Sequence, residues 1–145
     1  MNTIKEIKLS YSKNEVENIK ITDSNSAYKV LINNWDMDTI ELQEEFKVLL
    51  LNRANHVLGI YPLSKGGVSG TIVDVKLLLA SAIKANASGI IIAHNHPSGN
   101  LKPSESDIRL TRKINEAAKL LDLNLLDHII VTKCSYYSFT DSSVV

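Results

Sequence analysis

The fold is decided by the stretch His94-Asn95-His96-Pro97-Ser98-Gly99, which follows the apolar run Gly-Ile-Ile-Ile-Ala at 89–93. Side chains alternate between the two faces of a β-strand, so the two histidines point the same way and Asn95 points to the opposite face. A carboxylate follows at Asp107. Two histidines and one aspartate, with a fourth position for water, are the ligand set of a catalytic zinc site.

The same stretch leads into a helix. Ser104 and Asp107 have the spacing of a capping box, in which a hydroxyl caps the first turn and a carboxylate three residues later returns to the backbone. This interpretation needs no chemistry. It is compatible with a metal site, because a capped helix start is a rigid place from which to direct a carboxylate.

The whole string is more specific than the histidine pair. It has His-x-His-Pro, then a serine separated by seven residues from the second histidine, then an aspartate three positions further on. This pattern resembles the JAMM (MPN+) metalloprotease signature, and the fuller run HNHPSGNLKPSESD resembles the RadC branch of that superfamily. Further similar stretches are EEFKVLLLN, SGT at 69–71, ANASGIIIAHNHPSG, and LLDHIIV followed by YYSF. They cover roughly residues 40 to 140.

The resemblance implies an α/β fold, a JAB/MPN-like (cytidine-deaminase-like) mixed β-sheet flanked by helices. It implies one Zn²⁺ per chain, with His94, His96 and Asp107 as ligands. It assigns the general base to Glu44, although the adjacent Glu45 is a competitor that spacing alone does not remove. The resemblance also gives Ser104 a catalytic role, as a hydrogen-bond donor to the oxyanion of the reaction.

Composition restricts the class of protein. The chain of 145 residues fits one domain with a real core, and Lys plus Arg equals Asp plus Glu at 16 each. No overall positive field therefore attracts nucleic acid. A single cysteine, Cys134, excludes an internal disulfide and a cysteine-rich zinc site. The start MNTIKEIKLS lacks the apolar core of a signal peptide, and no apolar run is long enough for a membrane span. We expect a cytoplasmic protein.

Hydrophobic periodicity predicts the order of elements. We expect short edge strands within 1–22, helices over 24–34, 74–86 and 104–121, and strands over 46–52, 56–61, 89–94, 125–132 and 136–140. We divide the chain into an N-terminal extension with a helix (1–39) and a RadC-like JAMM/MPN domain (40–145). The glycine-rich segment 64–71 lacks the Gly-Lys-Ser/Thr order of a phosphate loop. We expect it to be a flexible loop or short strand beside the site.

Two further histidines receive structural interpretations. His56 is expected at the exposed edge of a turn. Asp127 and His128 open a predicted strand, where they are either support for a metal ligand or a satisfied structural pair, and we favour the structural pair.

Three functions remain open. The first is a zinc metallopeptidase or isopeptidase, whose partner is a peptide or isopeptide substrate. The second is an MPN-like binding module that keeps metal without turnover. The third is a RadC-like DNA-repair accessory, which would use a basic patch of Arg109, Arg112 and Lys113. The DNA-repair function is the weakest of the three, because the chain has no net charge and because its N-terminal section departs from the helix-hairpin-helix-like module of longer RadC proteins. Pairing of hairpin edges leaves a homodimer open.

Overall fold

The computed structural model describes residues 3–12, 18–67 and 71–144 and forms a five-stranded sheet in the order β2-β1-β3-β4-β5. The strands are β1 (Glu45–Leu51), β2 (Val57–Lys65), β3 (Gly89–Asn95), β4 (Asn124–Val131) and β5 (Tyr136–Ser138), and the helices are α1 (Ser24–Asn33), α2 (Val75–Lys84) and α3 (Glu105–Leu120). β3 and β4 are parallel, and the other neighbouring strands are antiparallel. The predicted mixed α/β sheet flanked by helices is confirmed.

Each face of the sheet carries its own hydrophobic core. On one face α1 packs its buried Ala27 and Leu31 against alternate residues of the three central strands, such as Ile91. On the other face α2 and α3 cover the intervening residues, including Ile92. β3 is the middle strand and is buried along its whole length, as its unbroken apolar run predicts.

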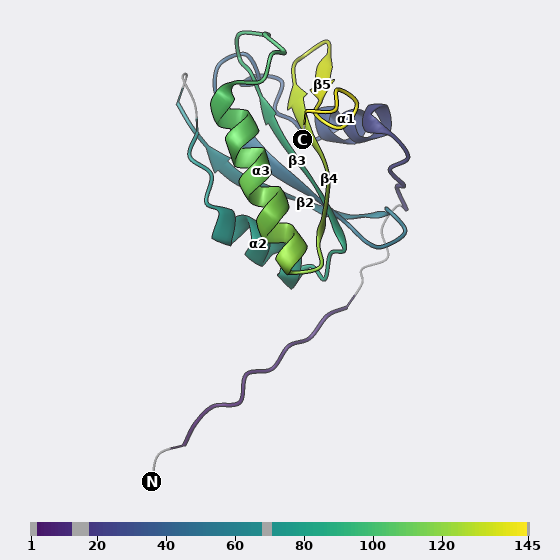
Figure 1. The fold of residues 1–145 in the computed structure, drawn as a ribbon, viewed down its shortest axis with the longest axis vertical. Helices are drawn as coiled ribbons and strands as arrows, with labels where there is room; N and C mark the ends of the chain where they lie inside the picture. Colours follow the sequence, from purple (N-terminus) through teal and green to yellow (C-terminus); the bar gives the residue numbers. More distant parts are fainter. Residues whose placement is uncertain (1–2, 13–17, 68–70, 145) are drawn as a thin grey trace.

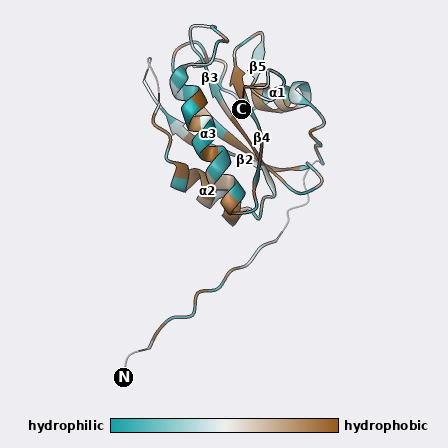
Figure 2. Cartoon of the chain, viewed as in Figure 1, coloured by the Kyte–Doolittle hydropathy of each residue, from teal (hydrophilic) through white to brown (hydrophobic). Residues whose placement is uncertain are grey.

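The helices begin where capping residues stand in the sequence. The carboxylates of Asp23 and Asp74 accept hydrogen bonds from the backbone of the first turns of α1 and α2, and Ser104 does the same for α3. Figure 2 shows hydrophilic and hydrophobic residues alternating along α3, whereas α2 is largely hydrophobic. The three predicted helices are confirmed, and no end differs from the expected one by more than two residues.

The N-terminal section differs from the expected edge strands. Residues 3–12 form an extended, exposed segment that leads away from the sheet in Figure 1, and Ile4, Ile7 and Leu9 are each almost fully exposed. Among the described residues of this section, pairing is limited to an isolated bridge between Lys20 and His56. The remainder of that expectation, residues 1–2 and 13–17, lies outside the described residues. The division of the chain after residue 39 stays a prediction.

In the parts of the chain that the structure describes, no helix combines the length and the hydrophobicity needed to cross a membrane.

Candidate metal centre

β3 delivers the two histidines at its end. His94 lies two residues after Ile92 on β3, so its side chain points to the same face, which α2 and α3 cover. Its partner on the neighbouring strand β1 is Phe46. Asn95 points to the opposite face, where its amide donates to the carbonyls of Ile40 and Gln43. Its side-chain oxygen accepts the Glu45 backbone N–H. The expectation that Asn95 satisfies nearby backbone groups is confirmed.

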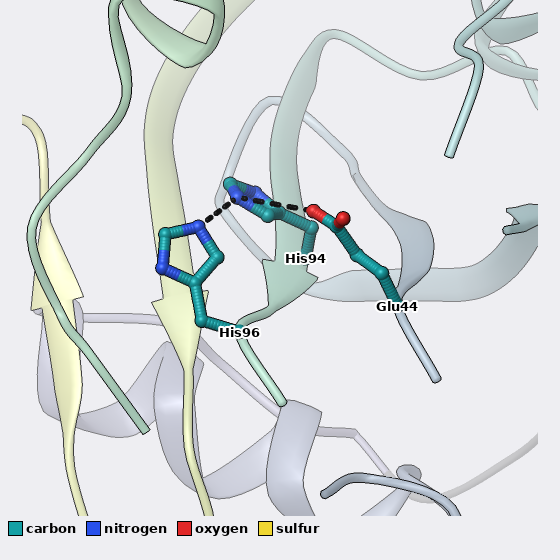
Figure 3. A group of neighbouring side chains, drawn as sticks. All are labelled: Glu44, His94 and His96. Atoms are coloured by element: carbon teal, nitrogen blue, oxygen red, sulfur yellow. Dashed lines mark hydrogen bonds and ion pairs between the residues drawn. The ribbon is translucent and has the colours of Figure 1, made fainter. Parts of the chain in front are cut away.

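Of the two adjacent glutamates, Glu44 faces the histidines. Its Oε1 lies 3.7 Å from His94 Nε2, and Figure 3 shows Glu44 and His96 on either side of the His94 ring. Glu45 turns to the other face of the sheet and lies 3.6 Å from the ammonium group of Lys47. Alternation along the segment that enters β1 causes this division.

The glycine-rich segment after β2 supports Glu44. The Gly66 N–H donates to the Glu44 carbonyl at 2.9 Å, and the Glu44 N–H donates to the Gly67 carbonyl at 3.4 Å. These bonds fix the backbone from which the carboxylate reaches the histidines. The expectation that this loop lies beside the site is confirmed for Gly66 and Gly67, whereas residues 68–70 lie outside the described residues.

Asp107 reaches the same histidines from α3. Its Oδ1 lies 3.4 Å from His94 Nε2, and its Oδ2 lies 3.4 Å from His96 Nε2. Asp107 Oδ2 also accepts the Ser104 N–H at 2.9 Å, while the Ser104 hydroxyl accepts the Asp107 N–H at 3.0 Å. The predicted capping box is confirmed, and it aims the carboxylate at the histidine pair. The Ser104 hydroxyl acts as an acceptor here, so its own hydrogen is left for another partner.

The donor atoms fit a small divalent cation. The two Nε2 atoms are 2.9 Å apart, and one donor atom each from Glu44, His94 and His96 lies within 4.8 Å of the others. Bond lengths of 2.0–2.2 Å in a tetrahedral zinc site place neighbouring ligand atoms about 3.3 Å apart. The contacts of 2.9 to 3.7 Å among these atoms bracket that value. Imidazole nitrogens with carboxylate oxygens are also ligands that zinc accepts.

Electrostatics couple Asp107 to the histidines. Burial by itself raises the pKa of the Asp107 carboxyl, but its contacts with His94 and His96, when these imidazoles are protonated, outweigh burial and hold the pKa well below its usual range. Burial lowers the pKa of His96, but Asp107 and the carbonyl of Asn100 outweigh it, and the net pKa is raised. A carboxylate that stays ionised is the form that binds a cation.

His128 lies directly behind His94. Its Nε2 is 2.8 Å from His94 Nδ1, and its Nδ1 is 2.6 Å from the Thr111 hydroxyl. Burial lowers the pKa of the His128 imidazole well below its usual value. Asp127 has no such contact with the site, since its carboxylate accepts from Ser138 and from the Thr140 backbone. The Asp127 carboxylate also accepts the His128 backbone N–H at 2.8 Å, as the structural interpretation expects, whereas the His128 ring contacts His94. Support of a metal ligand by His128 stays a prediction.

Register explains why the sequence alone did not place His128 behind His94. In the parallel pairing of β3 with β4, His128 is the partner of Ile92, so it lies on the same face as His94. Alternation within β4 separates His128 from Asp127, but only the register between the two strands shows which face is next to the site.

Similarity to known proteins identifies the family of this chain. A profile of the RadC-like JAB domain matches residues 21–144. A UPF0758 protein of Flavobacterium johnsoniae is 46% identical over 128 residues, which are 86% of this chain and 53% of that protein. A UPF0758 protein of Porphyromonas gingivalis is 44% identical over 126 residues, covering 86% of this chain and 54% of that protein. The chain spans about half the length of these curated relatives. It belongs to the RadC-like JAB domain family.

Proposed function

We propose that this domain is a zinc-dependent hydrolase of the JAMM metallopeptidase type that cleaves a peptide or isopeptide amide bond. The observation that carries the proposal is the convergence of carboxylates from two different elements, Glu44 before β1 and Asp107 in α3, on the Nε2 atoms of His94 and His96. A structural zinc site uses four protein ligands, whereas a catalytic one uses three and keeps one position open. Two carboxylates beside two histidines allow one to bind metal and the other to move protons.

The ligands are His94, His96 and Asp107. Zinc bound there would polarise the substrate carbonyl and lower the pKa of an attacking water molecule to about 7. Asp107 suits the ligand role because its contacts keep the carboxylate ionised and because the capping box fixes its direction.

Glu44 acts as the general base and then as the general acid. Its carboxylate accepts a proton from the water that attacks the amide carbon, and it returns that proton to the leaving amine nitrogen as the C–N bond breaks. Ser104 donates its hydroxyl hydrogen to the oxyanion that develops on the substrate carbonyl oxygen. Asn95 takes no part, because its side chain is occupied on the opposite face of the sheet.

Metal analysis with a substrate screen tests this proposal. The chain purified without chelator should hold about one zinc ion, and His94→Ala or Asp107→Asn should bind zinc much more weakly, because each removes one of three ligands. The zinc-loaded chain should hydrolyse at least one member of a panel of peptide and isopeptide substrates. Failure of the wild type to bind zinc after reconstitution contradicts the proposal.

A binding module without turnover is the second candidate, favoured by the close grouping of Glu44 with both histidines. If Glu44 is itself a ligand, it is not available to move protons. Zinc binding with no hydrolysis of any panel member, combined with loss of zinc in Glu44→Gln, would support this candidate over the hydrolase.

A further inference from the structure

A chain of hydrogen bonds runs from the backbone of α3 to the far side of His94. The Thr111 hydroxyl donates to the Asp107 carbonyl oxygen at 2.7 Å, and Thr111 Oγ1 lies 2.6 Å from His128 Nδ1. His128 Nε2 in turn lies 2.8 Å from His94 Nδ1. His94 and His128 are each 1% exposed, and Thr111 is 2% exposed, so water does not compete for these bonds.

The direction of every hydrogen bond in this series follows from the first one, between the Thr111 hydroxyl and the Asp107 carbonyl. A carbonyl oxygen only accepts, so the single hydrogen of the Thr111 hydroxyl is used on Asp107. Thr111 Oγ1 must then accept from His128, which places the proton of a neutral His128 ring on Nδ1. His128 Nε2 is therefore an acceptor, and it takes the Nδ1–H of His94. The neutral His94 ring is left with an unprotonated Nε2, the atom that faces Glu44, His96 and Asp107.

The ring orientations agree with this assignment. Both nitrogens of His128 lie at hydrogen-bond distance from polar partners. If the ring were turned over, ring carbons would lie at these two positions and both hydrogen bonds would be lost. Phe139 also stacks on the His128 ring, with ring centroids 4.4 Å apart and ring planes inclined by 12°. The acceptor behind His94 is thus held in place by the strand that carries it and by an aromatic contact.

We infer that Thr111 and His128 are positioning residues, which hold His94 in the Nδ1–H tautomer so that its Nε2 lone pair is directed into the metal centre. The chain begins at the carbonyl of Asp107, so the same element that presents the aspartate also sets the protonation of the histidine opposite it. A metal-binding histidine generally donates its second ring N–H to a carboxylate, a backbone carbonyl or water, and loss of that acceptor typically lowers metal affinity by about 10–100-fold. Here His128 Nε2 takes the place of that acceptor. The role in metal binding rests on the proposed zinc site, whereas the tautomer assignment does not.

Three variants of the full chain separate positioning from packing. His128→Phe keeps an aromatic ring against Phe139 but removes the acceptor, and it should weaken zinc binding by about 10–100-fold in a competition with a chelating dye. His128→Gln offers a carbonyl oxygen near the position of Nε2 and should restore most of that loss. Leu78→Ala is the control, because Leu78 is a fully buried core residue on the same face with no part in the chain of bonds, so it should lower stability without changing zinc affinity.

A second measurement reads the tautomer without metal. Long-range ¹H–¹⁵N correlation spectra of the metal-free chain at mildly alkaline pH should show protonated Nδ1 and bare Nε2 for both His94 and His128. Thr111→Val keeps the side-chain shape but removes the hydroxyl, and it should release both rings into mixed tautomers. A bare Nδ1 on wild-type His94 overturns the inference, and so does a Thr111→Val spectrum identical to that of the wild type.

The two proposals fail in different ways. A wild type with the expected tautomers that binds no zinc overturns the hydrolase proposal and retains the tautomer assignment. If His128→Phe binds zinc as tightly as the wild type does, the positioning role is overturned and the zinc site is retained.

Discussion

Glu44 and Glu45 illustrate how much a single position matters in this site. The two carboxylates are adjacent in the chain, but one lies beside His94 and the other beside Lys47 on the opposite face. They are therefore a matched pair of substitution sites, one inside the proposed machinery and one outside it.

Glu44→Gln should retain zinc and lose activity. The amide keeps the size of the carboxylate but cannot accept the proton of water, so turnover should fall by roughly 10²–10⁴-fold, the usual contribution of a positioned base. Metal analysis and hydrolysis rates, both measured on the purified variant, check this. Glu45→Gln should leave turnover and zinc content nearly unchanged. If activity is lost in Glu45→Gln alone, the assignment of Glu44 as the base is wrong.

The pair formed by Asp107 and His96 predicts a pH dependence of stability for the metal-free chain. The lowered pKa of Asp107 contributes stability above the unfolded value of about 3.9, and that stability is lost as pH falls through the folded pKa. The raised pKa of His96 contributes stability below about 6.5, and that stability is lost as pH rises through the folded pKa. Both contributions are fully present together only between about pH 3.9 and about pH 6.5.

Asp107→Asn should therefore be most destabilising, relative to the wild type, at about pH 5 and much less so at about pH 8. Urea unfolding of both proteins in the presence of a chelator measures the difference at each pH. A difference in unfolding free energy that is the same at both pH values would show that the charges of this pair do not contribute.

At the scale of the element, the N-terminus of α3 has an observed task, capping, and a proposed one, catalysis. The capping box fixes the first turn, and the same turn directs Asp107 toward the histidines while the Ser104 hydroxyl keeps a hydrogen to donate. Capping and catalysis make different demands on residue 104, since capping needs an acceptor or tolerates glycine, whereas the oxyanion needs a donor.

Substitutions at Ser104 should separate the two tasks. Ser104→Ala should lower the free energy of unfolding by about 0.5–2 kcal/mol, whereas Ser104→Gly should cost only a few tenths. Both should reduce turnover by about 10²–10³-fold, because neither side chain donates a hydrogen bond. Ser104→Thr, which keeps the hydroxyl, is the control. Denaturant titrations and rates are measured on each variant. Full activity in Ser104→Gly would reduce the serine to a cap.

At the scale of the whole molecule, the site lies at one end of a sheet that is packed on both faces. α1 closes one core and α2 with α3 closes the other, and these cores consist of side chains that do not belong to the metal centre. The fold should therefore persist without metal, unlike small domains in which zinc supplies the folding free energy.

Chelation of the zinc-loaded chain should lower the melting temperature only modestly. Metal binds the folded state alone, so its removal takes away a stabilisation that depends on free zinc, while both cores remain. Thermal unfolding followed by circular dichroism, with and without chelator, measures the shift. Complete unfolding on chelation would make the zinc site structural and contradict its assignment as a catalytic centre.

The sequence by itself determined those features that depend on neighbours along the chain. Alternation on β3 put His94 and His96 on one face, cap residues fixed the helix starts, and the apolar run at 89–93 identified the central strand. Each of these follows from backbone geometry that repeats every two or every 3.6 residues. The family and the mixed sheet were predictable for a different reason, because a contiguous motif resembles that of the RadC branch.

Only the tertiary structure decided which distant residues meet. Which of Glu44 and Glu45 faces the histidines, and the place of His128 behind His94, depend on the register of β1 and β4 against β3. A shift of one residue in either register would turn the other face toward the site. Register between strands is set by side-chain packing and hydrogen bonds across the sheet, and no local pattern encodes it. The tautomer of His94 is the final consequence, since it depends on a partner 34 positions away.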